Sequence, residues 1–323
     1  MLELAFSATD LGQTRFALSP LWEVLTSLRT LHADGVRPLH RRWVARTRPR
    51  LSGVGLLTEL VPPHGYAPDF LTPPPAAPAP TLDAELAALA RTDQTRLRAD
   101  LDRLPHLGPA ARRLYEDPAD GLPRLIEEIR TYWGIALAPH WTRLRGVLEA
   151  DVLHQSRRFA AEGAAAVLRE LHPGVRWGEE VLSLAKPDCG QSGSLAGRGL
   201  LLVPSAFVWP SVLIINAAPE AVQLCYPTRG VGSLWEQAPV QVPDAVAGVL
   251  GRARALLLTQ LAEPASTTEL AHRTGMSAGG VSQHLTALRA AGIVTSHRAG
   301  RSVLYRRTGV AETLLAAAAE TWS

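Results

Sequence analysis

Cysteine and lysine are both scarce in this chain. Two cysteines, Cys189 and Cys225, allow at most one disulfide bond, which excludes a disulfide-stapled scaffold and a zinc site built from several thiolates. Lys186 is the only lysine among 33 basic residues. Because alanine, proline and glycine are also frequent, we interpret the arginine bias as a consequence of genomic base composition rather than selection for guanidinium chemistry.

A long uninterrupted hydrophobic segment is also missing. The longest apolar run, residues 200–215, is broken by Pro204 and Pro210 and is too short to cross a bilayer. The first residues lack the basic start and the apolar run of a signal peptide. These absences predict a cytoplasmic protein that does not contact a membrane.

The length and the hydrophobic content of the chain are sufficient for a folded protein of more than one domain. The chain has 323 residues, of which 46% are hydrophobic and 20% are charged, and this length predicts two or three domains. The net charge of +3 is weak but unevenly distributed. Residues 251–323 contain eight arginines and four acidic residues, so this segment carries +4 and the preceding 250 residues carry −1. The positive charge is therefore concentrated near the C-terminus.

The first 240 residues predict a mainly helical domain that contains a small sheet, an α+β fold. A helix begins at Ser19-Pro20, and residues 82–171 have apolar side chains at helical spacing. The proline-rich residues 72–80 are interpreted as a semi-rigid spacer or an exposed loop. Short β-branched runs then predict the strands of a mostly antiparallel sheet, at residues 181–184, 199–203, 212–215 and 222–226.

Residues 244–323 have the pattern of a helix-turn-helix. Residues 244–261 predict a first helix. Ser266 and Glu269 form the capping box of a short helix that stops at Gly275, and Ser277 caps the next helix. The apolar residues of that helix recur at i, i+4 and i+7 and therefore face the core: Val281, Leu285 and Leu288.

A hairpin and a closing helix complete this C-terminal domain. Two β-prone runs, residues 293–297 and 302–306, are joined by four residues that include Arg298 and Arg301. A hairpin with arginines at its tip, directly after a helix-turn-helix, is a wing. The closing helix is expected to turn Val310, Leu314, Leu315 and Ala318 inward.

The outward face of the second helix suits duplex DNA. Small residues let a helix enter the major groove deeply, and Gln283 can hydrogen-bond an adenine edge through two atoms. The N–H groups at the starts of both helices can bind phosphates, and the wing arginines can reach the backbone or the minor groove. We predict double-stranded DNA as the partner, contacted by Thr267, Thr268, Ser277, Ala278, Gly279, Ser282, Gln283, Thr286, Arg298 and Arg301.

Residues 269–277, 281–294 and 298–305 closely resemble the ArsR family of bacterial winged-helix repressors. They contain the pattern S-x-H-L-x-x-L-x-x-A-G-[LI]-V followed by R-x-G-R-x-x-x-Y. The resemblance implies a homodimer, built partly on the first and last helices of residues 244–323, that binds an inverted-repeat operator. Family members that sense metals usually carry a C-x-C pattern before the recognition helix. Residues 267–272 contain no cysteine, so we predict neither a metal site nor a cofactor.

The first 240 residues resemble an uncharacterised domain that commonly precedes an ArsR-type module in bacterial regulators. The resemblance is carried by residues 10–23, 171–177, 196–207 and 226–232. It implies no biochemical activity. From the domain order we assign residues 1–240 a regulatory or dimerising role, on which a small-molecule effector would act.

Enzymatic signatures in these 240 residues are weak. Residues 190–199 are glycine-rich but lack the Gly-Lys-[Ser/Thr] ending of a phosphate loop, and no Gly-x-Ser-x-Gly elbow occurs. Asp151, His154 and His140 lack the spacing of a metal site. The eight tryptophans are interpreted mainly as core residues, with an apolar ligand pocket as the alternative.

The sequence thus predicts a non-enzymatic, sequence-specific transcriptional regulator, with repression as the expected sign. One alternative makes the N-terminal domain an enzyme or a small-molecule binder with the winged helix as an appended control module. A second alternative makes the winged helix a protein-interaction module, against which the arginines of the wing argue.

Overall fold

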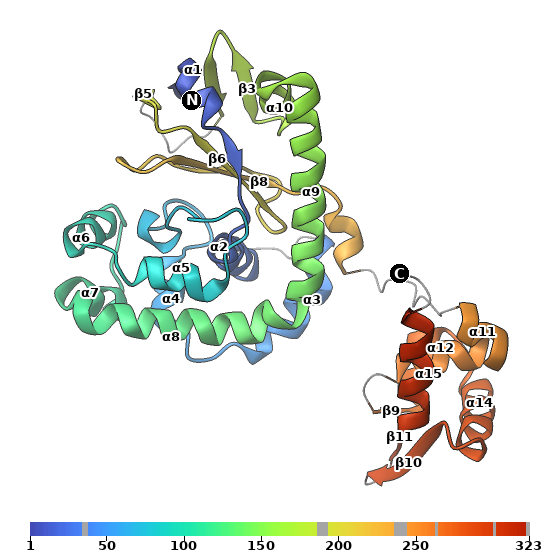
Figure 1. Ribbon diagram of the computed structural model, residues 1–323. Helices are drawn as coiled ribbons and strands as arrows, with labels where there is room; N and C mark the ends of the chain where they lie inside the picture. Colours follow the sequence, from blue (N-terminus) through green and yellow to red (C-terminus); the bar gives the residue numbers. More distant parts are fainter. Residues whose placement is uncertain (34–37, 186–192, 236–243, 262–263, 300–301, 321–323) are drawn as a thin grey trace. The chain divides into compact units, whose positions relative to one another are not determined.

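The chain folds into two compact units, residues 1–235 and residues 236–323. A computed structural model describes residues 1–33, 38–185, 193–235, 244–261, 264–299 and 302–320 (Figure 1). Each unit has a hydrophobic core of its own residues. Within the described ranges, no helix is long and apolar enough to cross a membrane.

Helices supply most of the N-terminal unit. The α-helices are α1 (Ala8–Gly12), α2 (Pro20–His32), α3 (Arg41–Thr47), α4 (Gly55–Leu60), α5 (Leu82–Leu89), α6 (Gln94–Asp102), α7 (Pro109–Glu116), α8 (Pro118–Ala136), α9 (Trp141–Glu162) and α10 (Ala164–Glu170). Short 3₁₀ turns are η1 (Pro38–His40), η2 (Arg48–Arg50), η3 (Asp69–Leu71), η4 (Ala138–His140) and η5 (Val231–Leu234). The strands are β1 (Leu2–Ala5), β2 (Arg15–Phe16), β3 (Val175–Gly178), β4 (Val181–Leu184), β5 (Gly193–Ser194), β6 (Leu200–Ser205), β7 (Leu213–Ile215) and β8 (Val222–Pro227).

The predicted α+β class is confirmed, but the strands of the described residues pair differently from the single, mostly antiparallel sheet expected. They form two sheets, ordered β3-β4-β1-β5 and β2-β6-β8-β7. Three pairs are parallel, β1 with β5, β2 with β6 and β6 with β8. The difference arises because β7 lies beyond β8 rather than between β6 and β8. Two short N-terminal strands, which the sequence pattern did not reveal, also join the sheets.

The sheet that contains β6 and β8 is covered on both faces. Leu201 and Val203 of β6 pack with the helices, whereas Leu200 and Leu202 pack against residues of the other sheet. In Figure 1 this sheet lies between the helical layer that includes α2 and the region of β3 and α10. Burial on both faces explains why β6 is a continuous apolar run without polar alternation.

Helix α2 is confirmed as the sequence predicted it. The hydroxyl of Ser19 accepts a hydrogen bond from the Trp22 amide at 3.1 Å, and Pro20 occupies the first turn, where its missing N–H costs nothing. The proline-rich residues 72–80 form a loop within this unit rather than a spacer between units. Leu18 donates a backbone hydrogen bond to the Pro78 carbonyl at 2.8 Å, which fixes this loop beside the start of α2.

The C-terminal unit contains α11 (Asp244–Leu250), α12 (Arg252–Gln260), β9 (Ala265–Ser266), α13 (Thr267–Thr274), α14 (Ala278–Ala290), β10 (Val294–Ala299), β11 (Ser302–Arg307) and α15 (Gly309–Glu320). The single helix expected at residues 244–261 is broken at Gly251, whose φ of +81° no continuous helix can contain. The inner face expected for α15 is also wrong at one position. Ala311 is fully buried there, whereas Val310 is 64% exposed.

Candidate nucleic-acid interface

The short helix α13 begins with the predicted capping box. The Ser266 amide donates to the Glu269 carboxylate at 2.7 Å, and the Glu269 amide donates to the Ser266 hydroxyl at 3.3 Å. Gly275 ends the helix with a left-handed φ of +72°. This reciprocal cap fixes where α13 starts and therefore where its first N–H groups lie.

Replacing Ser266 with alanine is expected to lower the free energy of unfolding of the C-terminal unit by about 0.5–2 kcal/mol, because the cap hydrogen bond is lost. Thermal unfolding followed by circular dichroism measures the change. Thr268→Ala, at an exposed position of the same helix, is the matched control and should change stability much less. Equal stability of the two variants would contradict this role of Ser266.

Helix α14 has one buried face and one exposed face. Val281, Leu285 and Leu288 are at most 1% exposed. The opposite face carries the residues predicted to contact DNA, all of them exposed: Ala278, Gly279, Ser282, Gln283 and Thr286. A Cβ placed on Gly279 would meet nothing within 4 Å, so this face is open for close approach by another molecule.

Two of the hydroxyl groups predicted to contact DNA already form hydrogen bonds with the backbone of α14. The Ser277 hydroxyl accepts a hydrogen bond from the Gly280 amide at 3.2 Å and is the N-cap of α14. The Thr286 hydroxyl donates to the Ser282 carbonyl at 2.8 Å. Both side chains remain exposed, but their hydroxyls are less available to a base than the Gln283 amide.

The first turns of α13 and α14 present backbone donors. Ser266 caps the third N–H of α13 and Ser277 caps the third N–H of α14. Helix geometry gives the preceding N–H groups no acceptor within their own helix. These are the amides of Thr267 and Thr268 in α13, and of Ala278 and Gly279 in α14. Such pairs of amides, with the positive end of the helix dipole behind them, suit phosphate oxygens.

The wing is an antiparallel hairpin of β10 and β11 whose inner edge pairs with β9. Arg298 is exposed and lies within β10 opposite Val303. It therefore belongs to the strand and not to the connecting segment that the sequence suggested. Arg301, the other predicted wing contact, lies outside the described residues.

Two arginines of this unit have structural contacts that sequence reasoning missed. Arg307 is half-buried and donates to the carbonyls of Leu258 and Thr259 at 2.8 and 2.7 Å, which ties the base of the wing to the end of α12. Arg289 donates to the Ser296 hydroxyl at 3.3 Å and links α14 to β10. Neither contact has a local sequence signal, because each joins elements that are brought together only by folding.

Comparison with known proteins identifies this unit. Residues 252–296 match the model of a bacterial regulatory protein family, the arsR family. The C-terminal unit carries an ArsR-family helix-turn-helix domain. This match covers α12 through the first half of β10, which includes the exposed face of α14.

A curated relative supports the assignment of the ArsR-family domain. The HTH-type transcriptional regulator NmtR of Mycobacterium tuberculosis is 40% identical over 78 residues, which is 24% of this chain and 65% of NmtR. The chain thus spans slightly less than two thirds of that relative. The crystal structure of NolR from Sinorhizobium fredii aligns with 24% identity over 25% of this chain and 85% of NolR, with a TM-score of 0.22. In the N-terminal unit, residues 96–232 match a family of unknown function, DUF5937.

The weaker candidates of the N-terminal unit have structural roles. Both carboxylate oxygens of Asp151 accept hydrogen bonds, from the Tyr226 hydroxyl at 2.8 Å and from the Arg229 amide at 3.2 Å. Within the described part of the chain, no group of three or more His, Cys, Asp or Glu could hold a metal ion. Part of the glycine-rich segment, residues 190–192, lies outside the described residues. Trp22 is buried and donates to Gln223 at 2.9 Å, so it is a core residue.

Proposed function

We propose that this chain is a sequence-specific DNA-binding repressor that acts as a homodimer on an inverted-repeat operator. The observation that carries the proposal is the exposed face of α14, which presents Gln283 among small residues. The N-termini of α13 and α14, capped by Ser266 and Ser277, precede this face in the sequence. Arg298, which is exposed, follows it in β10. Gln283 would specify a base pair, whereas the backbone amides and Arg298 would hold phosphates.

The homodimer is proposed from the first and last helices of the C-terminal unit. Val249 of α11 is 75% exposed and Val310 of α15 is 64% exposed, and these two helices contact each other. Large apolar side chains exposed on adjacent helices suit burial against a second copy. A two-fold dimer would place its recognition helices in successive major grooves, roughly 34–36 Å apart.

We assign residues 1–240 a regulatory or dimerising role, and residues 244–323 DNA binding. An effector that binds the N-terminal unit would change DNA affinity only if it prefers one of two states of the dimer. The protein would then act in the cytoplasm as a regulator without catalysis of its own.

Fluorescence anisotropy with DNA from the region upstream of its own gene, against a scrambled duplex at equal salt, tests this function. Gln283→Ala is expected to cost about 1–3 kcal/mol on the cognate site and to relax preference at one base pair. Arg298→Ala should weaken both duplexes and reduce the salt dependence of binding. Arg91→Ala, which removes an exposed charge from the N-terminal unit, is the matched control and should bind normally.

Two results would contradict the proposal. Equal affinity of the wild-type protein for cognate and scrambled duplexes would exclude sequence-specific regulation at that site. A uniform loss in the Gln283 variant, without relaxed preference, would show that the recognition face is misplaced.

A further inference from the structure

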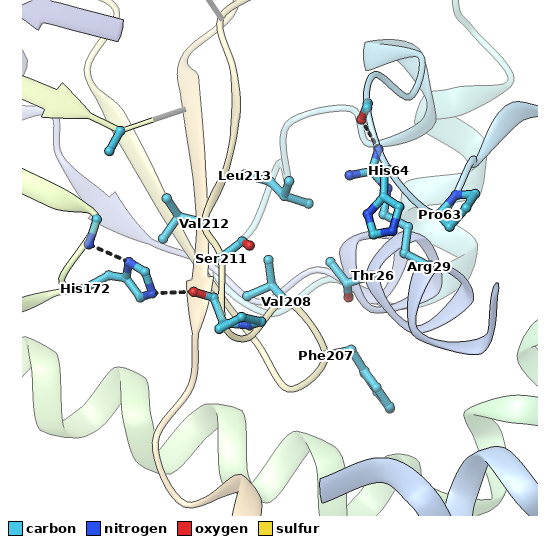
Figure 2. A pocket seen from close by; sticks show the side chains of 14 residues that line it. Thr26, Arg29, Pro63, His64, His172, Phe207, Val208, Ser211, Val212 and Leu213 are labelled. Carbon is cyan, nitrogen blue, oxygen red and sulfur yellow. Dashed lines mark hydrogen bonds between the residues drawn. The ribbon is translucent and has the colours of Figure 1, made fainter. Parts of the chain in front are cut away.

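A cavity of about 420 Å³ lies in the N-terminal unit, outside every element of the DNA-binding face. Its walls come from α2, from residues 63–65 after α4, from the turn before β3, and from the segment after β6 that runs into the first residue of β7, Leu213. Figure 2 shows Arg29 beside His64 on one side and Val208, Ser211 and Val212 on the other. A volume of this size accommodates a small organic molecule.

Arg29 is the charged group of this cavity. Its Nη2 donates to the Gly65 carbonyl at 2.7 Å, and its Nε is buried without a hydrogen-bond partner. Among the described residues, no carboxylate forms an ion pair with it. A guanidinium is satisfied by several acceptors and remains charged in proteins, so a half-buried one with a single carbonyl partner is under-satisfied.

The neighbouring buried groups do not neutralise this charge near pH 7. Burial raises the pKa of Glu23, on the same helix, to about 8, so that carboxyl is mostly protonated. Burial likewise raises the pKa of the Cys225 thiol. The His172 Nδ1 accepts from the Gly174 amide, so its Nε2 carries the proton that is donated to the Pro210 carbonyl, both at 2.9 Å. These two hydrogen bonds hold the ring in the wall of the cavity.

One part of the wall is hydrocarbon, formed by Phe207, Val208, Val212 and Leu213, and lies beside polar lining residues such as Thr26 and Ser211. Phe207 and Val208 are at most 5% exposed, and Val212 and Leu213 are half-buried. One cation beside an apolar wall matches a ligand with one negative charge and a hydrocarbon body. A dianionic phosphate would bring a second negative charge for which the cavity has no cation among the described residues. An uncharged ligand would leave the positive charge of Arg29 without an anionic partner.

We propose that this cavity binds a small monocarboxylic acid, whose carboxylate pairs with Arg29 and whose apolar body lies against Phe207, Val208 and Leu213. Binding at this site does not depend on the DNA-binding role. The inference that such an acid is the effector of the regulator does rest on the function proposed above.

Isothermal titration calorimetry and thermal shift of the full chain test the binding step. The probes are benzoate, phenylacetate and isovalerate, with benzamide as the uncharged analogue of benzoate and inorganic phosphate as the anion without an apolar body. We expect at least one carboxylate to bind and raise the melting temperature, and benzamide and phosphate to bind at least tenfold more weakly. Absence of binding by all three carboxylates, or equal binding of benzoate and benzamide, would overturn the proposal.

Variants then locate the site. Arg29→Met keeps the hydrocarbon stem and removes the charge, and it should weaken carboxylate binding at least tenfold. Arg98→Met is the matched control, because Arg98 is also half-buried with one hydrogen bond to a carbonyl, that of Tyr115 at 3.0 Å. If Arg29→Met fails to fold, Ser211→Trp fills the cavity from an exposed position and should abolish binding. Unchanged affinity in the folded Arg29 variant, or in Ser211→Trp, would overturn the assignment.

DNA binding with and without the carboxylate separates this proposal from the proposed function. A carboxylate that binds and changes anisotropy on cognate DNA supports both. A carboxylate that binds a protein without specific DNA affinity supports the site and contradicts the regulator.

Discussion

Replacing Glu23 with glutamine is expected to stabilise the N-terminal unit increasingly as the pH rises. Glu23 is fully buried and accepts hydrogen bonds from the Ala206 amide at 3.1 and 3.3 Å. Burial raises its pKa from 4.5 to about 8, although hydrogen bonds from Ser205 and Ala206 lower it in part. Glutamine has nearly the same shape as the protonated carboxyl and can keep the acceptor for Ala206.

The sign follows from proton binding in the two states. Between pH 4.5 and about 8 the unfolded chain has released the Glu23 proton while the folded chain retains it. Stability therefore falls with rising pH by about 1.4 kcal/mol per unit, and the total reaches roughly 5 kcal/mol. The glutamine variant lacks this loss, so it should match the wild type near pH 4.5 and exceed it most above pH 8.

Urea unfolding followed by tryptophan fluorescence at pH 5, 7 and 9 measures this effect. Glu85 has a pKa raised to about 7 by burial and adds a similar slope at lower pH, which both proteins share. Glu116→Gln, an exposed substitution, controls for the loss of one carboxylate. A constant difference between Glu23→Gln and wild type across this pH range would show that Glu23 ionises normally in the folded protein.

Replacing Gly199 with alanine is expected to destabilise the same unit by about 2–5 kcal/mol. Gly199 has a φ of +70°, and an added Cβ would lie 2.6 Å from Gln13 Cβ and 2.9 Å from the Gln13 carbonyl oxygen. Its amide also donates to the buried Asp10 carboxylate at 3.0 Å. The left-handed backbone costs an alanine about 1–2 kcal/mol, and the close approach of the Gln13 backbone adds about 1–3 kcal/mol.

Gly197→Ala separates these two costs. Gly197 has a similar φ of +80°, but a Cβ there would meet nothing within 4 Å. It should therefore show only the backbone cost. Thermal unfolding measures the loss of stability in both variants. An equal loss in Gly199→Ala and Gly197→Ala would show that the contact with Gln13 is unimportant.

Local physical chemistry made much of the C-terminal unit predictable. The capping box of Ser266 and Glu269 and the buried stripe of Val281, Leu285 and Leu288 are confirmed, because each depends on residues within two helical turns. The break at Gly251 was not predicted, since apolar spacing continues across it. A glycine can adopt a left-handed conformation, but its presence in the sequence does not show that it does so.

Long-range pairing was the part that the sequence could not supply. The runs that became β4, β6 and β8 were recognisable by composition, yet nothing local indicates that β6 pairs in parallel with β8 or that β1 joins β4. The same limit applies to the candidate site. Helical periodicity places Gln283 on an exposed face, whereas the buried contacts of Arg307 with α12 depend on tertiary structure.

The position of β1 also constrains how the protein is made. Leu2 pairs with Leu184 and Ala5 pairs with Val181, so a ribosome must add about 180 residues after β1 before its partner exists. At about 5–20 residues per second this takes roughly 10–40 s, during which the strand edge is open to other chains. The helices can form earlier from nearby residues, but the sheet of β3, β4, β1 and β5 cannot be completed before residues 193–194 have been made. A fusion or chaperone that holds the first five residues would therefore keep β1 from pairing with β4 and leave this sheet incomplete.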